Sequence, residues 1–260
     1  MTLPRNAQGE VVQLLALPGF LAFFVVSMWV GIRLLLLWSR TRENPELLMG
    51  IGVLGIGPLG FGIAMAAFLS SQSSPELAKV LVAIASTTVA TGVSAKYVFN
   101  WLIYHPGSRV AKAVVFTAMA LLVGSIVGDG LTNHFAPEAW QKPGFSTVRQ
   151  VVQVGALLWG SAEAFGWWRR MQRRVAIGLG DALVANRFLL WSIGAGAAGL
   201  GSAIGTVVGA LAGRPMTELP ALTLALSLFG LASASALWLA FVPPARYLAR
   251  IRRQAQNAST

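Results

Sequence analysis

The 260-residue chain is 55% apolar and only 11% charged, and it carries nine tryptophans, no cysteine and a formal net charge of +11. A soluble domain has about a quarter of its residues charged. Here the charges stand in short clusters between runs of roughly twenty apolar residues, the length of a membrane-spanning helix. This pattern predicts an all-α, multi-pass membrane protein and argues against a nucleic-acid-binding protein. The lack of cysteine excludes disulfides, Cys-ligated metals and a thiol nucleophile.

Seven apolar runs predict one transmembrane domain, residues 1–260, with seven helices. The runs lie at about 14–38, 47–70, 78–103, 113–132, 148–168, 187–212 and 219–242. The first run lacks a small-residue cleavage site, so it is interpreted as a span and not as a cleaved signal peptide. A basic tail, 243–260, follows the last run. Its stretch "ARYLARIRRQAQ" is expected to form an amphipathic helix on the inner leaflet.

The distribution of positive charge predicts the orientation. Fourteen of the twenty Lys and Arg residues stand at the ends of, or just after, the first, third, fifth and seventh runs. Because Lys and Arg are enriched on the cytoplasmic side of membrane spans, the N-terminus is expected outside and the C-terminus inside. Most tryptophans fall at the same span ends, as an interfacial belt would. We expect an integral protein of the bacterial inner (plasma) membrane.

Runs 1–3 and runs 5–7 share sequence features, so they are interpreted as two copies of one three-helix unit. Run 1 ends "IRLLLLWSR" and run 5 ends "AEAFGWWRR", runs 2 and 6 are both rich in glycine, and runs 3 and 7 end "WLIYHPGSR" and "WLAFVPPAR". This predicts a 3+1+3 parallel repeat, a construction known from transporters. The plan resembles the SWEET sugar carriers and the rhodopsin-type bundles, as architecture only. The alternative is that Trp, Pro and Arg are ordinary inner-interface residues.

Three ionisable residues within the runs are candidate functional residues, since such residues are costly in a bilayer. Arg33, Lys96 and Glu163 each stand five residues before a tryptophan. They should therefore share a depth about 7–8 Å inside the inner belt, at 1.5 Å per residue. This predicts an intramembrane charge network in which Glu163 pairs with Lys96 or Arg33, either as a switch or as a static lock. Snorkelling to the interface is the alternative.

A second polar group is predicted at the outer end of the fourth run. Asp129, Asn133 and His134 could form an outward-facing pocket for a small polar ligand. The alternative is a helix end that enters a wet loop. His105 and His134 fall on opposite sides, which argues against a haem held by two histidines and against a compact metal site. No cofactor and no metal are predicted.

The loop after the fifth run concentrates positive charge. It contains Arg169, Arg170, Arg173, Arg174 and Arg187, together with Asp181. Together with the basic tail, these residues are expected to contact lipid headgroups or an acidic cytoplasmic protein at 169–187. The alternative is that they serve only as topology signal and anchors.

Two short motifs resemble those of intramembrane aspartyl proteases such as presenilins. They are "GLGD" at 178–181 and "LPAL" at 219–222. That chemistry needs two facing carboxylates, and the only other aspartate, Asp129, is predicted at the opposite membrane face. No catalytic residue is therefore predicted. Asp181 is expected to cap the helix that begins near Ala182.

Glycines predict close helix packing. Gly201, Gly205, Gly209 and Gly213 recur every four residues in the sixth run, a spacing that brings helices together. In the second run, Pro58 among glycines predicts a kink.

Two functions are compatible with these features. The first is a seven-helix, receptor-like sensor that passes a signal to a separate cytoplasmic partner. The alternative is a carrier of a small apolar or lipid-like solute, since a fold does not determine a function. An intramembrane enzyme is the third reading and lacks a convincing acid–base pair.

Overall fold

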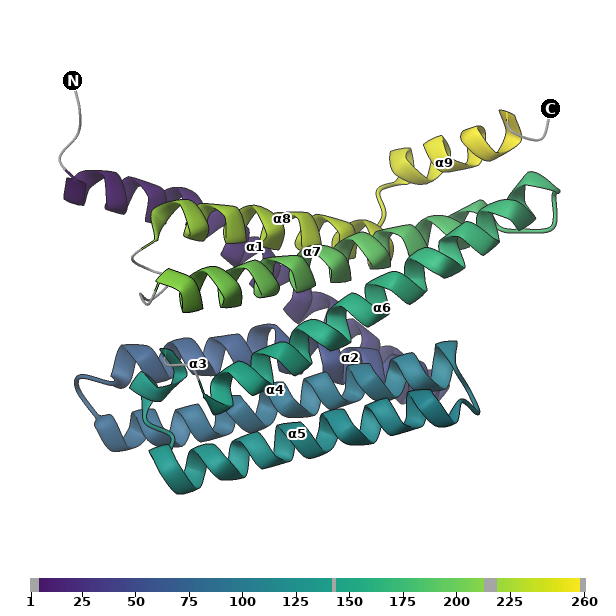
Figure 1. The fold of residues 1–260 in the computed structure, drawn as a ribbon. Coiled ribbons are helices and arrows are strands. Elements are labelled where there is room, and N and C mark those ends of the chain that lie inside the picture. Colours follow the sequence, from purple (N-terminus) through teal and green to yellow (C-terminus); the bar gives the residue numbers. More distant parts are fainter. Residues whose placement is uncertain (1–4, 142–143, 213–218, 258–260) are drawn as a thin grey trace.

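The computed structural model describes residues 5–141, 144–212 and 219–257, and over these ranges the chain is entirely helical, without strands. The helices run up and down in an antiparallel bundle (Figure 1). The connections at 42–43, 105–108 and 177–181 lie at one end, together with the last helix of the chain; we call this the basic end. The connection at 71–74 lies at the opposite end, together with the helix ends at Asn133, Phe145, Ala212 and Pro220.

A helix, or in one case a broken helix, covers each of the seven predicted runs. The elements are α1 (Arg5–Thr41), α2 (Asn44–Ile56), α3 (Pro58–Ser70), α4 (Pro75–Tyr104), α5 (Arg109–Asn133), the 3-10 turn η1 (Pro137–Gln141), α6 (Phe145–Ala176), α7 (Ala182–Ala212), α8 (Pro220–Phe241) and α9 (Ala245–Asn257). Proline is the first residue of α3, α4 and α8, where its missing N–H has no helical partner to lose.

Six helical segments in the described ranges are long and apolar enough to cross a membrane. They are Leu14–Thr41, Asn44–Ser70, Pro75–Tyr104, Arg109–Asn133, Ala182–Ala212 and Pro220–Phe241. The α6 helix has 32 residues but is not among them. The predicted fifth run is less apolar than the others because it contains Arg149, Gln150, Gln153 and Glu163. The structure thus shows an all-α protein with the helices of a multi-pass membrane protein.

Six of the long segments form a closed ring. Around this ring, α1 packs against α2, α2 against α4, α4 against α6, α6 against α7, α7 against α8, and α8 back against α1. The α5 helix lies outside the ring against α4 and α6, and α3 packs on α4. The ring closure joins α1 to α8, the first and last long segments of the chain.

The predicted kink in the second run is present. Helices α2 and α3 meet at Gly57, whose φ of −84° and ψ of −106° are not helical. Pro58 has no N–H to donate to the carbonyl of Leu54, so the ladder is interrupted there. Just before the break, a Cβ at Gly55 would lie 2.8 Å from the Cα of Gly92. The backbones of α2 and α4 therefore touch, as two glycines permit.

Glycines also bring α7 close to its neighbours. A Cβ at Gly201 would lie 3.0 Å from Phe229 Cβ of α8, and one at Gly199 would lie 2.9 Å from Leu158 of α6. Of the other predicted packing glycines, Gly205 is buried and Gly209 half-buried, while Gly213 lies outside the described residues. The contact with α6 uses a glycine outside the predicted four-residue series.

Candidate functional site

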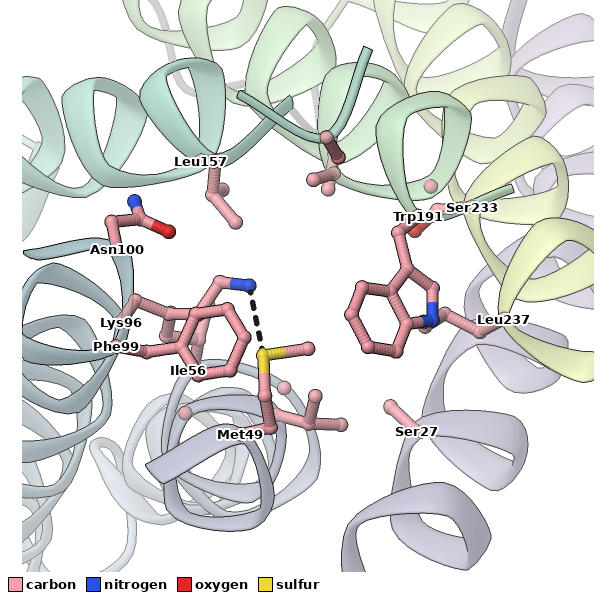
Figure 2. Close-up of a pocket in the computed structure, with 18 of the residues that line it drawn as sticks. Ser27, Met49, Ile56, Lys96, Phe99, Asn100, Leu157, Trp191, Ser233 and Leu237 are labelled. Carbon is pink, nitrogen blue, oxygen red and sulfur yellow. Dashed lines mark hydrogen bonds between the residues drawn. The ribbon is translucent and has the colours of Figure 1, made fainter. Parts of the chain in front are cut away.

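A cavity of about 70 Å³ lies in the middle of the ring (Figure 2). All six ring helices line it, whereas α3 and α5 do not. One water needs about 10–15 Å³ measured in this way, so the cavity has room for about five waters or one small ligand. The broken point of the second run is part of the wall, through Ile56 and Gly57.

Most of the wall is apolar. Met49, Ile56, Leu157 and Leu237 present aliphatic or thioether surface, and the indole ring of Trp191 lies across the cavity from Met49 (Figure 2). An apolar wall with a few polar groups is the usual composition of a small-molecule site. The polar groups here come chiefly from α4.

Lys96 extends its ammonium group into the cavity (Figure 2). The residue is 8% exposed, and Nζ lies 3.4 Å from the sulfur of Met49 and 5.7 Å from the centroid of the Phe99 ring. The described part of the chain supplies it with no carboxylate. Thioether sulfur is a weak acceptor, so this buried cation lacks a counter-ion there.

Asn100 stands one helical turn after Lys96 and is fully buried. Its Nδ2 donates to the carbonyl oxygen of Ala156 on α6 at 3.2 Å, while its Oδ1 has no hydrogen-bond partner among the residues that the structure describes. Figure 2 shows that oxygen on the cavity side. Because a backbone carbonyl only accepts hydrogen bonds, the amide orientation follows from the Ala156 contact. The cavity thus holds a free acceptor next to a free cation.

Aromatic rings form a chain near the basic end of the cavity. Successive ring centroids from α4 to α8 lie 5.8–6.4 Å apart, within the range of aromatic pairs. The chain runs through Phe99, Tyr104, Trp167, Phe188, Trp191 and Phe241. Its members Phe99, Tyr104 and Trp191 also line the cavity, so this cluster forms part of the cavity wall.

The predicted network of Arg33, Lys96 and Glu163 is not formed. No hydrogen bond or salt bridge joins any two of these three residues in the described structure. Arg33 Nη1 donates to the carbonyl oxygen of Phe241 at 2.7 Å. Glu163 Oε1 instead lies 2.6 Å from His105 Nε2. Helix rotation decides these pairings, because a shared depth does not make two side chains face each other.

Glu163 therefore belongs to a different group. Its Oε1 also accepts from Trp159 Nε1 at 3.1 Å, and the His105 ring stacks on Trp159 with centroids 6.1 Å apart. The group ties the end of α4 to α6 at the basic end. Both members of the pair are partly exposed, His105 at 40% and Glu163 at 22%.

The predicted outer pocket is a closed ion pair. Asp129 is 2% exposed, and its Oδ2 accepts from Arg149 Nη2 at 2.7 Å. Asn133 Nδ2 donates to Asp129 Oδ1 at 2.9 Å, and Arg149 Nη1 donates to the Ser125 carbonyl at 3.2 Å. His134 is exposed at the end of α5 with a φ of 49°. The carboxylate is thus occupied by protein groups and is not open to a ligand.

The arginine-rich segment extends α6 beyond the ring and turns into α7. Arg169, Arg170, Arg173, Arg174 and Arg187 are all exposed. As predicted, Asp181 caps α7, because its Oδ1 accepts from the N–H of Leu183 at 2.8 Å. Asp181 and Asp129 lie at opposite ends of the bundle (Figure 1), so they cannot act as a protease dyad.

The tail forms the predicted helix, α9, which packs against α7. Tyr247, Leu248 and Ile251 are half-buried, whereas Arg246, Arg250 and Arg253 are exposed. Tyr247 Oη donates to Asn186 Oδ1 of α7 at 3.1 Å. We call the exposed arginines of α9 and of the α6–α7 segment the basic surface.

No group of three or more His, Cys, Asp or Glu residues in the described ranges could hold a metal ion. Two residues of the cavity, Asn100 and Trp191, are not among those predicted from the sequence, and neither is His105 as the partner of Glu163. Asn100 carries a detectable signal, since it is an amide one turn from Lys96 within an apolar run. Trp191 resembles the other interfacial tryptophans, so only its position identifies it.

No family model, curated protein or solved structure matches this chain, so its function must be inferred from the cavity and the surfaces around it.

Proposed function

We propose that the protein is a membrane carrier that binds a small solute in the central cavity. The observation that carries this proposal is the buried Lys96 ammonium, which faces the cavity without a carboxylate partner in the described structure. A buried ion without a partner is costly, and ionisable residues inside spans mark substrate or ion pathways. Residues of six helices line the cavity, as several helices line the substrate site of a carrier.

The carrier requires α6 to cross the membrane as the seventh span. Its polar residues are compatible with that position, because they face protein. Arg149 is 5% exposed and pairs with Asp129, and Glu163 contacts His105 and Trp159. Intramembrane polar residues characteristically pair inside a bundle.

We further propose the orientation with the basic end in the cytoplasm of a bacterium. The exposed arginines of the α6–α7 segment and of α9 support it, because positive residues favour the cytoplasmic side. With that orientation the N-terminus lies outside and the C-terminus inside.

The lining of the cavity supports the 3+1+3 repeat. The lining residues of α2 and those of α7 are spaced in the same way along the two helices. On α2 they are Met49, Gly52, Val53 and Ile56, and at the corresponding positions of α7 they are Trp191, Gly194, Ala195 and Ala198. Any helix that faces a cavity tends towards this spacing, so on its own it is weak support.

Stronger support comes from the lining residues that stand at the same distance in sequence from the tryptophans at the ends of corresponding spans. Lys96 and Ser233 each stand five residues before Trp101 and Trp238, and both line the cavity. Ser27 and Leu157, each eleven residues before Trp38 and Trp168, line it as well. In the proposed repeat, α1 corresponds to α6 and α4 corresponds to α8. The contact between α1 and α8 therefore corresponds to the contact between α6 and α4, and both are present. The cavity would then lie at the interface of the units, where such carriers bind substrate.

The break at Gly57 supports movement around the cavity. It interrupts the second span beside the site, while α7, its counterpart, is continuous. Carrier sites are typically formed by discontinuous helices. The two units therefore differ at the point where one segment can move against another.

The natural absence of cysteine allows a direct test. A single cysteine is introduced at Ser233, and a membrane-impermeant anionic thiol reagent is added to right-side-out or inside-out vesicles. A carrier that alternates its access should be modified from both sides. Val127→Cys, on the exposed surface of α5, is the control that should stay unmodified. Modification of the Ser233 position from neither side, or from one side only, would contradict the carrier.

A one-sided result would favour the second candidate, a sensor that signals to a cytoplasmic partner. The specific observation behind it is the basic surface, in which α9 is fastened to α7 through Tyr247 and Asn186. Such a surface fits an acidic protein or anionic lipids. In that case the cavity would hold the ligand that is sensed.

A further inference from the structure

The chemistry of the cavity also restricts the class of solute, on the premise that the cavity is the binding site proposed above. Lys96 contributes three N–H donors and one positive charge. Among the described residues, the ammonium forms a hydrogen bond to the sulfur of Met49 and a cation–π contact with the ring of Phe99. A ligand that contributes one negative charge would supply the missing counter-ion. A cationic ligand would meet repulsion, and a neutral one would leave the charge uncompensated.

The residues that line the cavity also limit the number of negative charges on the ligand. Arg33 is committed to the Phe241 carbonyl, and Arg149 belongs to the ion pair at the opposite end. Neither lines the cavity, and Lys96 is the one cationic residue among the described residues that do. A dianion would therefore bring a second charge into an apolar enclosure without compensation.

Asn100 adds a second requirement. One N–H of its Nδ2 is used by Ala156, and its Oδ1, which has no partner among the described residues, is an amide oxygen that can only accept a hydrogen bond. A ligand satisfies it with a donor, and leaving a buried acceptor unsatisfied carries a desolvation penalty. Because Lys96 and Asn100 are one turn apart on α4 and both line the cavity, one small ligand can offer its charge to the first and its donor to the second. An ammonium donor would repel Lys96, so a hydroxyl suits the site better.

The remaining wall and the volume limit the rest of the molecule. Phe23, Leu157, Trp191 and Leu237 offer apolar contact, and about 70 Å³ accommodates only a few non-hydrogen atoms. We propose that the cavity selects a small hydroxy-monocarboxylate, with its carboxylate on the Lys96 ammonium and its hydroxyl donating to Asn100 Oδ1. This replaces the apolar or lipid-like cargo expected from the sequence, because the lysine and the asparagine are polar groups that such a cargo would leave unpaired.

Calorimetric titration of the purified full-length protein in detergent tests the class. The probes are lactate, its neutral amide lactamide, propanoate, which lacks the hydroxyl, and chloride. Lactate should bind, propanoate should bind about tenfold more weakly, which corresponds to about 1.4 kcal/mol for the lost hydrogen bond, and lactamide should not bind at all. These comparisons use the wild-type chain, so they do not depend on the folding of a variant.

Variants then assign the contacts. Lys96→Met should abolish lactate binding, whereas Lys79→Met, a lysine of the same helix paired with Glu76 outside the cavity, should leave the Kd unchanged. Asn100→Leu should reduce lactate binding to the level of propanoate and leave propanoate unaffected. Elution volume on gel filtration checks that each variant is folded.

Several outcomes would overturn the proposal. They are equal binding of lactamide and lactate, binding that survives Lys96→Met, or no binding of any probe. Chloride binding as tight as lactate binding and insensitive to Asn100→Leu would indicate a simple anion site and would also overturn it. Two-sided access at Ser233 without lactate binding would leave the carrier standing and the solute class wrong. Lactate binding without two-sided access would do the reverse.

Discussion

Two buried cations of this protein, Arg149 and Lys96, have opposite surroundings. Near the end of the bundle that is opposite the basic end, Arg149 donates to the carboxylate of Asp129, which Asn133 also contacts. In the ring, Lys96 meets a thioether and an aromatic face, next to an unsatisfied amide oxygen of Asn100. The first group is complete without a ligand, and the second is not.

The difference separates a buried charge that the structure pairs from one to which we assign a function in the proposal. A complete ion pair holds α5 to α6 and offers a ligand nothing. An incomplete site costs stability, and a protein retains such a cost where binding requires it. Asp129 is therefore part of a structural ion pair, while Lys96 is the residue on which the proposed site depends.

The largest effect is expected at the complete pair. Asp129→Ala removes the carboxylate that faces Arg149 and should lower the free energy of unfolding by about 3–5 kcal/mol, since breaking a buried pair leaves a charge behind. Unfolding by detergent titration measures it. Glu76→Gln, which breaks an exposed pair with Lys79, should change it by only about 0–1 kcal/mol.

A double variant sharpens this prediction. Asp129→Leu with Arg149→Met should recover most of the lost free energy, because apolar replacements of a buried pair are often tolerated. If Asp129→Ala were no more harmful than Glu76→Gln, the view of this group as a structural lock would be wrong.

A substitution in the cavity is expected to change the free energy of unfolding in the opposite direction. Lys96→Met removes a buried charge and keeps a similar side-chain length, so without ligand it should raise the free energy of unfolding by about 1–3 kcal/mol. The same detergent titration applies, with Lys79→Met as the matched lysine control. A loss of stability would mean that Lys96 has a structural partner after all, and the contrast between the two regions would disappear.

The smallest effect is expected from a methyl group beside Lys96. A Cβ at Gly52 would lie 3.0 Å from Lys96 Cγ, whereas one at Gly194, its counterpart on α7, would lie 3.5 Å from Ala236 Cβ. Gly52→Ala should displace the lysine and weaken lactate binding about tenfold, or about 1.4 kcal/mol. Gly194→Ala should leave the Kd unchanged. Equal effects of the two substitutions would show that the position of Lys96 does not determine binding.

Local features of the structure could be predicted because they depend on neighbouring residues. The spacing of apolar runs placed the long helices, Pro58 marked the kink, Asp181 marked the start of α7, and the pattern of "ARYLARIRRQAQ" predicted α9. Lys96 was identified as a candidate because a charge inside an apolar run is detectable at once. Its expected partner was wrong, and so was the open pocket at Asp129.

By itself, the sequence determined the helical class of the chain, the approximate ends of its helices and the positions of its charges, since helix periodicity and hydropathy are properties of short segments. Only the tertiary structure decided that α1 closes on α8, that Asp129 meets Arg149, and that Asn100 and Trp191 share a cavity with Lys96. Each of these depends on how helices rotate and pack against segments distant in the chain. A small rotation of a helix exchanges one facing side chain for another while the hydropathy of every run stays the same.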